Sequence, residues 1–116
     1  MIPRLSAIPT ASAPCDDFLH HLAGAGFEGD IAVSAADRNV FATDNSIYQV
    51  EPAGVLFPKN IHDLKRIAKT LARAEFSGVT LAPRGGGTGT NGQSLTTGIV
   101  VDCSRHMNHI LDIDPV

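Results

Sequence analysis

Residues 83–93 read PRGGGTGTNGQ, and this stretch holds five of the 11 glycines in the chain. Glycine permits positive φ and lets a ligand approach the backbone closely. Successive N–H groups in such a run can turn toward one point and form a nest for an anion. The stretch contains no acid, and Arg84 gives it a positive edge. Polar side chains between the glycines add donors: Thr88, Thr90, Asn91 and Gln93. The stretch therefore predicts a site for a phosphate or a diphosphate.

Two common phosphate-binding motifs do not account for this stretch. A P-loop requires GxxxxGK[ST], and no lysine follows any of these glycines. Residues 87–92 match GxGxxG, but in a Rossmann unit the last glycine opens a helix. Residues 93–97 are short and polar, and an apolar segment follows at once. Because that leaves no room for a helix, we reject the Rossmann interpretation as well.

The sequence on either side predicts strands that alternate with helices. Apolar residues at helical spacing predict one helix from about Ser12 to Ala23 and another over residues 60–75, which begins with Asn60 as its cap and Asp63 three residues later. Residues 34–41 allow a short helix, and Thr43-Asp44-Asn45-Ser46 resembles a turn. Asp44 belongs either to the site or only to an Asx-turn. Strands are expected at 55–57, 79–82 and 98–102, with the start of a fourth at 110–113.

The helix over 60–75 connects two of these strands. A helical crossover of about 20 residues implies a parallel pair with a right-handed connection. The chain ends at Val116, directly after an apolar segment. We therefore expect it to be the front portion of a longer protein.

The composition is that of one small globular domain. The chain has 116 residues, of which 43% are apolar and 18% charged, so it is no disordered tail. A net charge of −3 argues against nucleic acid as the main partner. No apolar run approaches the roughly 18 residues that span a bilayer. Pro3, Pro9 and Pro14 interrupt the signal-like N-terminus, so we expect no secretory signal and a cytoplasmic location.

The cysteines and histidines do not predict a metal site. Cys15 and Cys103 lie far apart and outside any CxxC, which favours two reduced thiols and leaves one disulfide open. Cys103, His106 and His109 recur at intervals of three, and both residue types are zinc ligands. Spread across a strand end, these three side chains would not converge. We therefore predict no metal.

Three segments together resemble a known family. PRGGGTGTNGQ, the later stretch GIVVDCSRHMNHI (98–110) and Pro58 at the end of a strand are similar to the PCMH-type FAD-binding domain of the p-cresol methylhydroxylase / vanillyl-alcohol oxidase superfamily. Residues 29–58 resemble its D-2-hydroxyacid branch, the D-lactate and D-2-hydroxyglutarate dehydrogenases, in particular large bacterial members with iron–sulfur modules further on. The resemblance covers about residues 27–114.

The resemblance implies an α+β fold whose first subdomain is a small parallel β-sheet with flanking helices. It divides the chain into an N-terminal lead-in and helix (1–28), an irregular connecting segment (29–54) and a first subdomain that is incomplete at its C-terminus (55–116). The loop would cradle the FAD diphosphate, with these cofactor contacts: Arg84, Gly85, Gly86, Gly87, Thr88, Gly89, Thr90, Asn91, Gly92 and Gln93. Some relatives attach the flavin through a His in this loop. Thr88 and the absence of His there imply non-covalent FAD. Catalytic residues would lie beyond residue 116.

Three functions remain open at this point. The first is the front part of an FAD-linked oxidoreductase that acts on a small D-2-hydroxyacid and binds no nucleic acid. The second is a stand-alone phosphate- or nucleotide-binding module without redox chemistry. The third is a structural fragment that self-associates through an open sheet edge. The resemblance favours the first.

Overall fold

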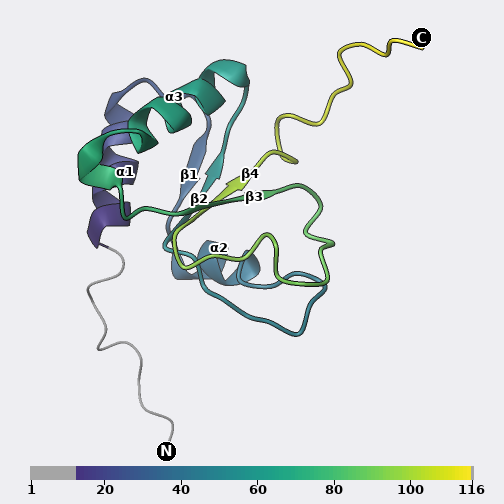
Figure 1. Cartoon of the computed structure of the whole chain (residues 1–116), viewed down its shortest axis with the longest axis horizontal. Coiled ribbons are helices and arrows are strands. Elements are labelled where there is room, and N and C mark those ends of the chain that lie inside the picture. The colour runs from purple at the N-terminus through teal and green to yellow at the C-terminus, as the bar shows by residue number, and fades with distance from the viewer. Residues whose placement is uncertain (1–12, 116) are drawn as a thin grey trace, which may run out of the picture.

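The computed structural model describes residues 13–115, so the predicted lead-in over residues 1–12 lies outside the described residues. The elements follow one another as α1 (Ala13–Gly24), β1 (Asp30–Ala32), α2 (Ala35–Val40), β2 (Gly54–Phe57), α3 (Ile61–Leu71), the 3-10 turn η2 (Ala74–Phe76), β3 (Leu81–Arg84) and β4 (Ile99–Asp102). Figure 1 shows the sheet in the middle, with α1 and α3 together at one end. This arrangement confirms the predicted α+β class.

The four strands form one sheet in the order β1-β2-β4-β3. β2, β4 and β3 are parallel, as predicted, whereas β1 pairs antiparallel with β2 at the edge. The predicted neighbours at 55–57 and 79–82 are parallel but not adjacent, because β4 lies between them. The predicted parallel pair is therefore not a direct one: the chain returns once more and places β4, which is buried along its whole length like β2, between the two strands.

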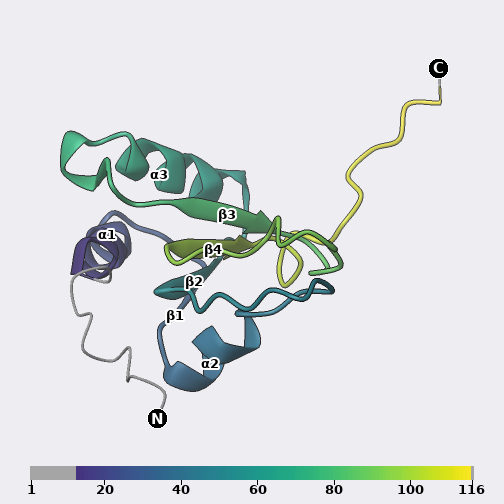
Figure 2. The same cartoon turned by 60° about the horizontal axis from the view of Figure 1, so that its bottom comes forward.

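Helices cover both faces of the sheet (Figure 2). On one face α1 and α3 pack over Leu56 and Ile99, and Phe18 meets Phe76 edge to face at 5.5 Å. On the other face, α2 packs against β2, and Val55, Phe57 and Val100 form a smaller core with Ala32 and Phe41. Alternate residues of β2 thus serve two cores, as the period of a strand requires.

Polar caps fix the start of α3, as the sequence predicted. The N–H of Asp63 donates to Oδ1 of Asn60 at 2.9 Å. The Asp63 carboxylate, fully buried, accepts the N–H groups of Glu28 and Lys59, each at 2.9 Å. The helix ends at Leu71 rather than near residue 75, and the last residues form η2 instead. Asp63 therefore ties α3 to the segment that precedes β1.

Three predicted segments differ from the structure. The strand expected at 79–82 runs from Leu81 to Arg84 and includes Pro83, which a sheet edge tolerates because no ladder N–H is needed on its outer side. The strand expected at 110–113 is wrong, since no described strand pairs with it and Ile110, Leu111 and Ile113 are exposed. The segment 29–54, expected to be irregular, carries β1 as well as α2, the short helix that the sequence allowed over residues 34–41.

Candidate functional site

The glycine-rich loop leaves β3 at Arg84 and joins β4 at Ile99. β3 and β4 run parallel, with Arg84 beside Asp102, and the N–H of Cys103 donates to the carbonyl of Arg84 at 3.0 Å. The strands before and after the loop therefore lie side by side, as expected, and β4 is buried along its whole length. Figure 1 shows the loop swinging out beyond the end of β3, away from α1 and α3, and then running back to the start of β4. Two hydrogen-bonded strands of the sheet therefore fix both ends of the loop.

The backbone of the loop leaves several amides available to a ligand. Gly87 and Gly92 have positive φ, +69° and +76°, a conformation that favours glycine. Within residues 13–115, the N–H groups from Gly86 to Thr90 make no hydrogen bond. They are therefore not tied up by carbonyls of the loop itself, and an anion can take them.

Two of the predicted site residues, Asn91 and Gln93, are hydrogen-bonded to each other. The N–H of Asn91 donates to Oε1 of Gln93 at 3.0 Å. The same Gln93 oxygen lies 2.5 Å from the place where a Cβ on Gly89 would stand. Gln93 therefore shapes the loop from within, and a side chain at position 89 would displace it.

Arg84 turns back toward the protein and anchors the loop. Its Nη1 donates to the carbonyl of Thr43 at 2.9 Å, and its guanidinium carbon lies 5.1 Å from the centre of the Phe41 ring. The same guanidinium fills the space in which a Cβ on Gly87 would stand. Gly87 therefore has two reasons to be glycine, its positive φ and its contact with Arg84.

A short hairpin lies beside the loop and is hydrogen-bonded to it. Residues 42–50, called hairpin 42–50 below, close through Val50 N–H to Ala42 O at 2.9 Å and a bridge between Thr43 and Gln49. The N–H of Asn45 donates to the carbonyl of Gly89 at 3.1 Å. The sequence indicated a turn here but not its contact with the loop, and the one available signal was the turn-forming run Thr43-Asp44-Asn45-Ser46.

Asp44 is the charged residue of hairpin 42–50. Its Oδ1 accepts the N–H of Ser46 at 2.7 Å and so forms an Asx-turn, one of the two roles that the sequence left open. Its Oδ2 is buried and has no hydrogen-bond partner in the part of the chain that the structure describes. Hydrogen bonds from Ser46, together with the positive charge of Arg84, lower the pKa of Asp44 below its usual value. Asp44 is therefore a carboxylate at neutral pH.

The segment after β4 carries the three residues that were considered as metal ligands and rejected, Cys103, His106 and His109. Asp102 accepts hydrogen bonds from Ser104 and Arg105, while Arg105 stacks on Phe57 at 3.5 Å and His106 pairs with Asp30 at 2.7 Å. No three His, Cys, Asp or Glu side chains among residues 13–115 gather as metal ligands would. Cys15 and Cys103 are free thiols, and burial raises the pKa of each.

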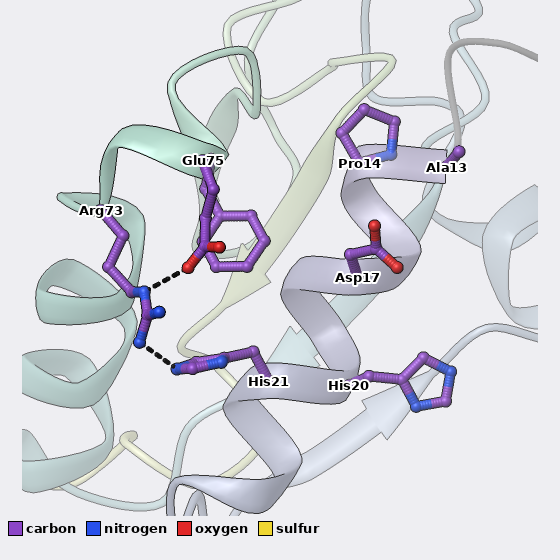
Figure 3. A pocket seen from close by; sticks show the side chains of 8 residues that line it. Ala13, Pro14, Asp17, His20, His21, Arg73 and Glu75 are labelled. Carbon is purple, nitrogen blue, oxygen red and sulfur yellow. Dashed lines mark hydrogen bonds and ion pairs between the residues drawn. The ribbon is translucent and has the colours of Figure 1, made fainter.

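A hollow of about 650 Å³ lies elsewhere, between α1 and η2 (Figure 3). Its charged groups are paired: Arg73 bonds to Glu75 at 2.5 Å and to His21 at 2.9 Å. His20 and Asp17 point away from that pair in the same view. The hollow holds no unpaired buried polar atom among the described residues, so the glycine-rich loop remains the better candidate.

No helix within residues 13–115 has the length and apolar character needed to cross a membrane.

Comparison with known proteins identifies relatives of this chain. Residues 52–116 match the family described as FAD binding domain. Over 115 residues the chain is 50% identical to the D-2-hydroxyglutarate dehydrogenase of Escherichia coli (strain K12), and over 114 residues it is 53% identical to that of Pantoea ananatis (strain AJ13355). These matches cover 99% and 98% of the chain but 11% of each relative.

A solved structure shares the fold. Physcomitrella patens BBE-like 1 superposes with a TM-score of 0.59 at 20% identity, covering 73% of this chain and 18% of that one. At that identity the likeness concerns the fold alone. The chain itself spans only 11% of the length of the dehydrogenases it matches.

Proposed function

The chain belongs to the FAD binding domain family, and from this membership we propose that residues 84–93 hold the diphosphate of FAD. The observation that carries the proposal is the row of N–H groups from Gly86 to Thr90, which make no hydrogen bond within residues 13–115. Hydrogen bonds from N–H groups to an ionised oxygen are about twice as strong as those to a neutral one. An anion with several oxygens is therefore the ligand that this loop suits best.

The residues present fit the cofactor. Gly85 has no atom within 4 Å of an added Cβ, and Gly86 meets only the Thr88 methyl at 3.6 Å, so this side of the loop is open. Thr88 and Thr90 are exposed and offer hydroxyl donors to the same oxygens. Arg84 offsets the charge of Asp44, which would otherwise repel a diphosphate.

Each part of the predicted contact set takes a distinct role in this proposal. The amides of residues 85–90 bind phosphate oxygens, Gly92 provides the turn, and Arg84, Asn91 and Gln93 shape the loop. Position 88 is Thr, and residues 84–93 contain no His that could carry a flavin, which supports non-covalent FAD. When bound, the flavin accepts a hydride, and this chain's part is to hold and orient it.

We further propose that the chain is the diphosphate-binding portion of a longer D-2-hydroxyacid dehydrogenase. Its support is the identity of 50–53% to proteins named D-2-hydroxyglutarate dehydrogenase. The 2-hydroxyacid, the catalytic groups and the rest of the flavin site would then belong to other parts of that protein. Residues 55–116 would be the first subdomain of the flavin domain, and residues 29–54 would connect it to the N-terminal segment 1–28. Two free thiols agree with a cytoplasmic location.

A pair of matched variants tests the loop assignment. Gly85 and Gly78 both lack any atom within 4 Å of an added Cβ, and neither has a positive φ, so each accepts a side chain. In the complete gene product, we expect Gly85→Asp to weaken FAD binding at least about tenfold, because a carboxylate would face the diphosphate. Gly78→Asp adds the same charge before the start of β3, whereas the loop leaves the other end of that strand, so this variant should bind FAD like the wild type. Equal dissociation constants for the two variants, measured by flavin fluorescence, would overturn the assignment.

A further inference from the structure

We propose that Asp44, acting through hairpin 42–50 and Arg84, is a positioning residue that sets the glycine-rich loop in its flavin-binding shape. This inference rests on the proposed function of the loop. It adds a residue outside the glycine-rich stretch, 40 positions before Arg84 in the sequence.

Two hydrogen bonds join the hairpin to the loop at separate points. Arg84, at the start of the loop, donates to the carbonyl of Thr43 at 2.9 Å. Gly89, in its middle, accepts the N–H of Asn45 at 3.1 Å. These contacts lie on either side of Asp44 in the sequence, so the orientation of residue 44 controls both.

The Asp44 side chain holds that short segment in place. Oδ1 accepts the N–H of Ser46 at 2.7 Å and so forms the turn that aims the N–H of Asn45 at the loop. Oδ2 is buried, without a hydrogen-bond partner within residues 13–115, and lies 3.7 Å from the place of a Cβ on Gly89. A buried carboxylate oxygen without a hydrogen-bond partner is costly unless a nearby cation offsets its charge. Arg84 is the cation whose charge acts on it.

The sign of one electrostatic effect separates positioning from any other role. A carboxylate beside a diphosphate repels it, so an acid that only happened to lie there would weaken flavin binding. Its removal would then tighten the binding. An acid that shapes the loop has the opposite effect, because its removal lets the amides turn away from the phosphates.

The test uses Asp44→Asn in the complete gene product, with Asp17→Asn on α1 as a control of equal charge. Asparagine has nearly the same shape and keeps an oxygen that accepts the Ser46 N–H, so the turn is retained, while its uncharged amide removes the negative charge on which Arg84 acts. We expect FAD to bind at least about fivefold more weakly although a negative charge has been removed. In the flavin-free protein, the Asn45 amide should exchange its hydrogen several times faster. Asp17→Asn should change neither.

A second variant tests Arg84, the residue through which hairpin 42–50 is joined to the start of the loop. Arg84→Lys keeps the charge but loses the planar group that bonds to Thr43 and stacks on Phe41. We expect it to weaken FAD binding, and the double variant with Asp44→Asn to be no weaker than the more severe single variant, because both act on one unit. If the losses of FAD affinity in the two single variants add up fully in the double variant, Asp44 and Arg84 act independently, and the inference is wrong.

The outcomes distinguish this inference from the proposed function. If Gly85→Asp weakens FAD binding but Asp44→Asn leaves it unchanged or tighter, the loop binds flavin and the positioning role of Asp44 is wrong. If Asp44→Asn speeds exchange at Asn45 while neither variant changes FAD binding, the hairpin does hold the loop. The flavin site then lies elsewhere, and both proposals fall.

Discussion

At the scale of single residues, Asp63 is the most deeply buried charged side chain among the described residues. It is fully buried and accepts hydrogen bonds from Glu28, Lys59 and Arg66 at 2.9, 2.9 and 3.1 Å. Its own N–H is bound by Asn60. One carboxylate therefore ties the start of α3 to the segment before β1.

We expect Asp63→Asn to lower the free energy of unfolding by about 2–4 kcal/mol, because an amide cannot accept all three hydrogen bonds and leaves a buried donor unpaired. Urea unfolding of the 116-residue chain measures this. Asp17→Asn, on the exposed side of α1, should change the unfolding free energy by less than about 0.5 kcal/mol. A similar loss in both variants would contradict the role of Asp63.

The same residue gives stability a pH dependence. Burial alone raises the pKa of Asp63, but the N–H groups of Glu28 and Lys59 and the Arg66 guanidinium outweigh it, and the net pKa is lowered. A lowered pKa in the folded state contributes stability above the unfolded value of about 3.9. That contribution is lost as the pH falls through the folded pKa. Below about pH 4, the wild type should therefore lose stability more steeply than Asp63→Asn, and parallel curves would count against this cause.

For Asp63 and Asp44, the sequence predicts the contacts with nearby residues but not those with residues far along the chain. Asp63 was predicted as a partner of Asn60, because that pairing depends on a spacing of three. Its bond to the N–H of Glu28 spans 35 positions and has no local signature. Asp44 is similar, since its turn could be predicted, whereas the hydrogen bond from the neighbouring Asn45 to Gly89 could not.

At the scale of elements, the sequence predicted best where one short segment determines the outcome. The helical stripe around Ile67 predicted α3, and the glycine-rich stretch predicted a loop between two strands. β1 was missed because three half-exposed residues carry no usable alternation. The order of the strands was missed because pairing of β4 between β2 and β3 is a property of the folded chain.

We expect the packing of α1 on the sheet to be a major source of stability. Leu22 is fully buried in the core that α1 shares with α3. Leu22→Ala should lower the free energy of unfolding by about 2–5 kcal/mol, since it removes apolar contacts and leaves a cavity. Leu111→Ala is the matched control, because that side chain is 96% exposed. Equal effects of the two substitutions in urea unfolding would show that α1 is not docked as described.

At the scale of the whole molecule, the loop is too small to bind a flavin unaided. Four N–H groups that each contribute about 1.5–3 kcal/mol to a charged diphosphate give roughly 6–12 kcal/mol. Ordering about eight loop residues costs about 1–2 kcal/mol each, which is of the same size. Net affinity therefore depends on surroundings that hold the loop in advance and on contacts to the rest of the flavin.

We expect the 116-residue chain alone to bind FAD weakly, with a dissociation constant above the micromolar range, and the complete gene product to bind it tightly. Flavin fluorescence titration of both proteins measures the difference. Sub-micromolar binding by the chain alone would contradict the energy comparison and would favour a self-sufficient nucleotide-binding module.

The central claim is that the backbone of the glycine-rich loop grips the FAD diphosphate, and a crystal structure of the flavin-bound gene product tests it most directly. We expect at least two N–H groups between Gly86 and Thr90 to lie about 2.7–3.2 Å from diphosphate oxygens. Hairpin 42–50 should keep its bonds to Arg84 and Gly89. A diphosphate bound away from this loop, with these amides facing water, would contradict the account.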